Sequence, residues 1–119
     1  INQNKKIVRK EKIDFILAYT NKKALLFKRD EKRYWQHLWA PYESKDSKQK
    51  VINKKKALKS KNLKIAHKLS HLELEINLML LEFNDEFNIA SNMEYSWVNK
   101  KNIGNFGIPK PIKKILLEL

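Results

Sequence analysis

The sequence contains no cysteine and only two glycines, and these absences exclude several kinds of site. Without cysteine the chain can form no disulfide, has no thiol nucleophile, and offers no thiolate ligand to zinc or to an iron–sulfur cluster. Both glycines, Gly104 and Gly107, lie near the C-terminal end, so no glycine-rich loop is available to wrap a phosphate group. Several enzyme classes are therefore excluded for this chain.

Long apolar runs and clustered carboxylates are missing as well. No window approaches the roughly 18 consecutive apolar residues of a membrane-spanning helix. The N-terminal INQNKK also lacks the apolar core of a signal peptide. We therefore expect a cytoplasmic chain with no membrane segment. The 13 carboxylates form no cluster in the sequence that would suggest a Mg²⁺ site.

Basic residues dominate what is present. The net charge is +13, and of the 26 basic residues only Arg9, Arg29 and Arg33 are arginines, which leaves 23 lysines. Such a surface favours a polyanionic partner such as nucleic acid. The abundance of Lys, Asn and Ile is equally what AT-rich coding would produce, so composition alone leaves both explanations open. Lysine suits contact with phosphate better than the reading of bases.

Hydrophobic periodicity predicts one α+β domain. With 119 residues, 42% of them hydrophobic, the chain is long enough for a single core. Apolar residues at alternate positions predict strands over 13–19, 24–29, 62–70, 72–80 and 94–99, and the alternation is clearest over 72–80. We expect the fold to cover 13–119 and the polar residues 1–12 to form a linker or tail. The order of elements predicts a mixed or antiparallel sheet flanked by helices.

Two helices are predicted beside this sheet. The first lies within 44–62, with Ser47 as a possible cap and a thin apolar stripe formed by Val51, Ala57 and Leu58. The second ends the chain over 109–119, where Ile112, Ile115, Leu116 and Leu119 fall at positions i, i+3, i+4 and i+7.

The segment HKLSHLEL, residues 67–74, carries the only cluster that resembles a reactive site. His67 and His71 have the i, i+4 spacing of two metal ligands on a helix, but the local pattern is that of strands and no third ligand is evident. Ser70 has no neighbouring glycines to form a nucleophile elbow. From the residues alone, the segment is a polar turn between two strands.

Three segments, in order, resemble a known family. KALLFKRDEKRYWQHLWAPYE, HKLSHLELEINLMLLEF and YSWVNKKNIGNFGIPKPIKKILLEL are similar to the Nudix-fold C-terminal domain of MutY-type adenine DNA glycosylases. The resemblance implies an α/β/α sandwich around a mixed β-sheet. A Nudix hydrolase would carry a box rich in glutamate at 43–61, whereas this chain has mostly lysine there, so nucleotide hydrolysis through such a box is excluded on chemical grounds.

The resemblance also implies a function in DNA repair. The family's C-terminal domain recognises 8-oxoguanine opposite adenine in double-stranded DNA, and a separate N-terminal domain with an iron–sulfur cluster excises the adenine. We therefore expect no catalytic or metal-binding residue and no cofactor in this chain, and we expect 1–12 to be the linker from that missing catalytic domain. We further expect a monomer in a bacterial cytoplasm, associated with the nucleoid during repair.

The family's lesion-reading loop, F-S-H, falls on the hairpin turn. The matching residues here are Leu69, Ser70 and His71, with His67 at the upstream histidine, and Leu69 replaces the aromatic wedge. Nearby Lys64 and Lys68 are expected to contact phosphate. Two alternatives remain open at this point: a Nudix-fold nucleotide hydrolase with an altered metal site, and a nonspecific nucleic-acid-binding module.

Overall fold

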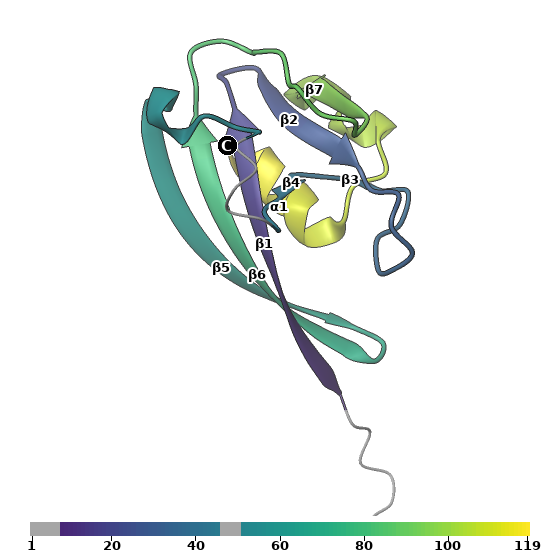
Figure 1. The fold of residues 1–119 in the computed structure, drawn as a ribbon. Helices are drawn as coiled ribbons and strands as arrows, with labels where there is room; N and C mark the ends of the chain where they lie inside the picture. Colours follow the sequence, from purple (N-terminus) through teal and green to yellow (C-terminus); the bar gives the residue numbers. More distant parts are fainter. Residues whose placement is uncertain (1–7, 46–50) are drawn as a thin grey trace, which may run out of the picture.

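One seven-stranded sheet organises the chain (Figure 1). A computed structural model describes residues 8–45 and 51–119. The strands are β1 (Arg9–Tyr19), β2 (Lys23–Lys28), β3 (Trp39–Ala40), β4 (Tyr42–Glu43), β5 (Lys59–Leu69), β6 (Leu72–Glu82) and β7 (Tyr95–Asn99). The helices are the 3₁₀ turns η1 (Lys54–Lys56) and η2 (Lys100–Asn105) and the α-helix α1 (Lys110–Glu118).

The sheet is mixed, as the sequence predicted. Its main path runs β3-β2-β1-β6-β5, while β4 pairs with β1 and β7 pairs with β2. The central pair, β1 and β6, is parallel from Arg9↔Leu72 to Tyr19↔Glu82, and the other pairs are antiparallel. The α+β class and the mixed sheet are therefore confirmed.

The core on one face of the sheet follows directly from the alternation in β6. Leu72, Leu74, Ile76, Leu78 and Leu80 are all buried, while the residues between them are partly exposed. Helix α1 covers this face and contributes Ile112 and Leu116 to the same cluster (Figure 1). The spacing of its apolar residues places one stripe against the sheet, so the predicted C-terminal helix is confirmed.

Loops cover the other face of the sheet. A second cluster there includes Ile16, Phe27, Ile52, Phe83 and Ile89. Over the described part of 44–62, the predicted helix is wrong: the chain forms only the η1 turn before β5 begins at Lys59. Ser47, its expected cap, lies outside the described residues. The sandwich therefore has α1 on one face and loop segments on the other in 8–45 and 51–119.

The first strand begins earlier than predicted. Residues 9–12 were assigned to the linker, but they extend β1 and pair with Leu72–Glu75 at the start of β6. The prediction failed because these residues are polar, and backbone pairing rather than burial places them in the sheet. Figure 1 shows this end of β1 projecting from the body beside the tip of the β5–β6 hairpin.

Within 8–45 and 51–119, no helix is long and apolar enough to cross a membrane.

Candidate functional site

The predicted lesion-reading loop is the tip of the β5–β6 hairpin. Ser70 and His71 form the two-residue connection between the strands, and both side chains are exposed. Leu69 pairs with Leu72 and packs, half-buried, against the core. The backbone amide of Arg9 donates to the carbonyl oxygen of His71 at 3.3 Å. The predicted polar turn is confirmed, and strands on both sides hold it in place.

A groove of about 710 Å³ opens beside this tip. Four parts of the chain line it: the hairpin tip, the projecting start of β1, the loop that follows β2, and the end of β4. The lining residues are Arg9, Glu11, Lys12, Lys32, Arg33, Tyr34, Glu43, Leu69, Ser70, His71 and Leu72. The structure thus brings together three of the six predicted site residues, namely Leu69, Ser70 and His71.

The other three predicted residues lie elsewhere on β5. Alternate residues of a strand point to opposite faces. His67 shares the α1-facing side with Leu69, and its ring centroid lies 6.0 Å from that of Trp35. Lys64 and Lys68 are exposed on the opposite side of the strand, away from the groove lining. The predicted phosphate contacts are therefore not on the face that carries the groove.

The wall of the groove opposite the hairpin holds an aromatic side chain that the sequence analysis did not select. Tyr34 is half-buried and meets Trp35 edge to face, with ring centroids 5.4 Å apart. Its hydroxyl accepts a hydrogen bond from Arg33 Nη2 at 2.9 Å. The guanidinium of Arg33 also lies 4.8 Å from the centre of the ring. This tyrosine is therefore held from several sides.

A buried ion-pair network fixes Arg33. Glu43 accepts from Arg29 Nη1 through one carboxylate oxygen and from Arg33 Nη2 through the other, both at 2.9 Å. Arg29 is only 6% exposed, so the network begins inside the protein and ends at the groove. Removing one partner of a buried ion pair costs about 3–5 kcal/mol, because the remaining charge stays buried without its partner.

This environment changes two pKa values in the groove. Burial is the largest influence on Tyr34 and raises the pKa of its hydroxyl, although the positive charge of Arg33 acts in the opposite direction. For Arg33, burial lowers the pKa, but the hydrogen bond to Glu43 and the carboxylate charge outweigh it, so the pKa is raised. At neutral pH Tyr34 therefore keeps its proton, and Arg33 keeps its charge.

Sequence reasoning missed this network for a simple reason. Arg29, Arg33 and Glu43 share no local periodicity, because their contacts depend on how the loop folds back toward β4. One signal was available: only three of the 26 basic residues are arginines. Arg9 and Arg33 line the groove, and Arg29 supports it through Glu43. A planar guanidinium, unlike an ammonium, can bridge one carboxylate and its neighbours at fixed geometry.

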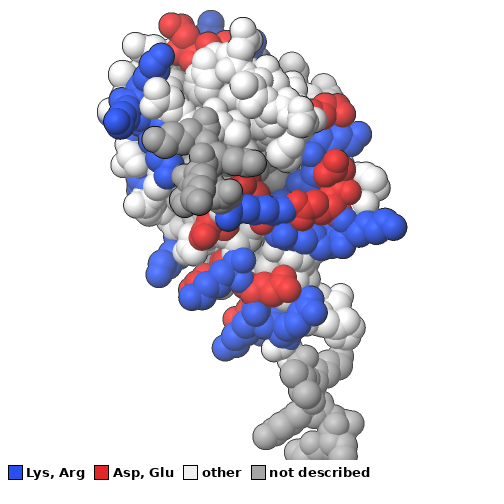
Figure 2. Space-filling view, in the orientation of Figure 1, with Lys and Arg blue, Asp and Glu red and all other residues white. Residues whose placement is uncertain are grey.

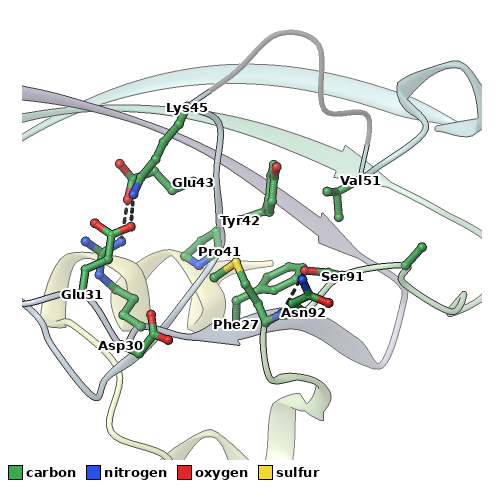
Figure 3. Close-up of a pocket in the computed structure, with 13 residues that line it drawn as sticks. Phe27, Asp30, Glu31, Pro41, Tyr42, Glu43, Lys45, Val51, Ser91 and Asn92 are labelled. Atoms are coloured by element: carbon green, nitrogen blue, oxygen red, sulfur yellow. Dashed lines mark hydrogen bonds and ion pairs between the residues drawn. The ribbon is translucent and has the colours of Figure 1, made fainter.

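A second cavity of about 750 Å³ lies on the other side of Glu43 (Figure 3). Asp30, Glu31 and Glu43 line it, and Figure 3 shows Glu31 directed toward Lys45. Cations engage Glu31 and Glu43, so these carboxylates are not free to ligate a metal. Among the residues that the structure describes, no three His, Asp or Glu side chains are grouped as a metal site requires.

The fold and the match of a family model agree. The model described as the NUDIX domain matches residues 15–118. The chain belongs to the NUDIX domain family. Among solved structures, it is similar to a C. elegans Ap4A hydrolase binary complex, with a TM-score of 0.64 and 13% identity over 90% of this chain and 93% of that one. At this level of identity the similarity shows the fold alone.

Two further relatives support the predicted resemblance to MutY-type C-terminal domains. Adenine DNA glycosylase of Buchnera aphidicola subsp. Schizaphis graminum (strain Sg) is 30% identical over 98% of this NUDIX domain chain. The chain spans 35% of that protein's length. The C-terminal domain of mouse MUTYH, solved in complex with human PCNA, has the same fold, with a TM-score of 0.54 and 13% identity over 90% of this chain and 86% of that one.

Proposed function

We propose that this chain is the C-terminal domain of an adenine DNA glycosylase and recognises 8-oxoguanine opposite adenine in double-stranded DNA. The observation that carries the proposal is the exposed Ser70–His71 tip, held by two strands at the edge of a groove, in a chain similar to an adenine DNA glycosylase. Excision of the adenine is proposed for a separate catalytic domain. The iron–sulfur cluster of that domain stays a prediction.

The chemistry of the tip suits the lesion. Guanine has a hydrogen-bond acceptor at N7, whereas 8-oxoguanine has a proton there and a carbonyl oxygen at C8. The Ser70 hydroxyl can accept from that proton or donate to that oxygen, because it rotates to suit its partner. Leu69 beside it offers an apolar contact in place of the family's aromatic side chain, without a stacking surface.

The hairpin tip needs a rigid support because the two bases of the pair move differently during the reaction. The adenine must leave the helix to be cut, while its partner stays bound on the opposite strand. The strands of the hairpin pair over their whole length, from Lys59↔Glu82 to Leu69↔Leu72. This pairing keeps Ser70 in one position relative to the core.

The test compares discrimination by the full-length glycosylase with and without the Ser70 hydroxyl. In Ser70→Ala, single-turnover excision of adenine opposite 8-oxoguanine should lose roughly 5- to 150-fold of its advantage over adenine opposite guanine, since a good base contact contributes about 1–3 kcal/mol. His71→Ala should change the ratio in the same direction. Ser60→Ala is the matched control, because Ser60 is exposed on the same strand at its far end.

Two results would contradict the proposal. Unchanged discrimination in Ser70→Ala and His71→Ala would exclude the tip as the lesion contact. Hydrolysis of oxidised nucleoside triphosphates by the chain in the presence of Mg²⁺ would favour a Nudix hydrolase with an altered metal site instead.

A further inference from the structure

The groove has a second wall, which takes no part in the proposed lesion contact. Its residues, Lys32, Arg33 and Tyr34, are consecutive in the loop between β2 and β3, and they line the groove together with Ser70 and His71. Two segments that are more than 30 residues apart in the sequence therefore share one groove. A ligand bound at the hairpin tip would lie next to this loop.

Contacts with the protein interior hold this loop in one conformation before any ligand binds. Glu43 joins Arg33 to the buried Arg29, and Arg33 in turn donates to the hydroxyl of Tyr34 at 2.9 Å. The backbone amide of His37 closes the loop by donating to the Arg29 carbonyl oxygen at 2.7 Å. Such prior ordering reduces the entropy that a surface loop loses when it binds.

Two groups on this wall are open to a ligand. Lys32 is exposed and has no ion-pair partner among residues 8–45 and 51–119. The Tyr34 hydroxyl accepts from Arg33, and its own proton has no acceptor in the described part of the chain. An ammonium group and a hydroxyl donor that line the same groove match an oxyanion.

The charge around the groove points to the same ligand. Arg9, Lys12, Lys32 and Arg33 outnumber the carboxylates of Glu11 and Glu43. Glu11 pairs with Arg9 at 3.3 Å and Glu43 pairs with Arg33, so Lys32 is left as the uncompensated cation on its wall. A phosphodiester supplies the negative charge that this wall lacks.

We propose that Lys32 and Tyr34 bind a backbone phosphate of the DNA strand whose base contacts the hairpin tip, and that Arg33 is a positioning residue for Tyr34. The proposal rests on the proposed function, because it places the phosphate beside the lesion contact. The phosphate contact fixes how far the strand enters the groove, and Ser70 then reads the base. Contacts with phosphate position a protein on DNA without distinguishing sequences.

The test measures the binding of the 119-residue chain to two duplexes over a range of salt concentrations, one with 8-oxoguanine opposite adenine and one with guanine there. Loss of one phosphate contact lowers the slope of log K against log[salt] by about 0.9. Lys32→Gln should show this loss equally with both duplexes, so the ratio of the two affinities stays constant. Lys55→Gln, which removes the same charge from η1 at the other end of β5, should leave the slope unchanged.

Nuclear magnetic resonance gives a second readout. The chain has three arginines, so its spectrum holds three side-chain Nε–Hε signals. Addition of DNA should shift the Arg33 signal in the wild type, while Tyr34→Phe should reduce that shift and weaken binding to both duplexes.

The outcomes separate this inference from the proposed function. An unchanged slope in Lys32→Gln, or an equal decrease in Lys55→Gln, would overturn the phosphate contact even if Ser70→Ala still lost lesion preference. Conversely, a decrease specific to Lys32→Gln in a chain that binds both duplexes equally would support the phosphate contact and contradict lesion recognition.

Discussion

Two residues in the loop that forms the second wall of the groove have a backbone conformation that L-amino acids rarely adopt. Trp35 has φ 63° and His37 has φ 70°, and they are the positive-φ residues other than glycine in the described chain. Each such residue costs roughly 1–2 kcal/mol. The Trp35 ring offsets this cost by stacking on Phe15, with centroids 6.4 Å apart and planes 19° apart. His37 is exposed, and no ring of the described residues stacks on it.

We therefore predict that His37→Gly stabilises the protein by about 0.5–1 kcal/mol, since glycine adopts positive φ without steric cost. Chemical denaturation followed by circular dichroism measures the change in the free energy of unfolding. Gln36→Gly is the control: Gln36 is not among the positive-φ residues, so the added flexibility should destabilise the fold. Equal destabilisation by both substitutions would show that the backbone at His37 is not strained.

At the level of single residues, the sequence predicted the hairpin tip but not its surroundings. The turn at Leu69, Ser70 and His71 could be predicted because it interrupts two strands with clear periodicity. The opposite wall of the groove could not be predicted from the sequence. The pairing of Arg29 with Glu43 joins residues 14 positions apart through a loop without a repeating pattern. Local spacing carries no information about such a contact.

Among the elements, β5 and β6 show which sequence signals decide structure. The alternation over 72–80 predicted β6 correctly, because a strand with one buried face needs apolar residues at every second position. The lysine-rich segment before β5 has too few apolar residues for a helical face, and among its described residues Ile52 alone is buried. Pairing with β6 instead determines where β5 begins, since this pairing starts at Lys59.

The start of β1 gives a prediction at this level. A variant that begins at Ile13 loses the parallel partners of Leu72–Glu75, so amide hydrogen exchange at residues 72–75 should become faster. A variant that begins at Val8 keeps β1 whole and serves as the control. Exchange that is equally slow in both variants would show that residues 9–12 do not protect the hairpin.

Charge is the property that sets the behaviour of the whole molecule. Lys and Arg side chains lie interleaved with Asp and Glu on the projecting part in Figure 2, yet the net charge remains +13. Like charges in a compact molecule repel one another and oppose folding. Exposed ion pairs such as Lys23–Glu86, at 2.8 Å, contribute little against this repulsion.

We predict that sodium chloride stabilises the fold. Raising its concentration from about 10 mM to about 150 mM shortens the screening length to about 8 Å, and the melting temperature should increase by a few degrees. Thermal unfolding followed by circular dichroism provides the measurement. Replacing Lys54, Lys55 and Lys56 with glutamate lowers the net charge from +13 to +7, and this variant should respond less. A lower melting temperature with added salt would mean that ion pairs outweigh repulsion.

The parallel pairing of β1 with β6 has a consequence for any polypeptide attached ahead of it. Because the Arg9 amide bonds to the His71 carbonyl, such a polypeptide enters the fold beside the hairpin tip. The attachment point therefore lies beside the proposed recognition site. A short linker to it keeps an attached domain at a high effective concentration there. In the proposed glycosylase, the catalytic domain and this domain then bind one duplex without any direct contact between their surfaces.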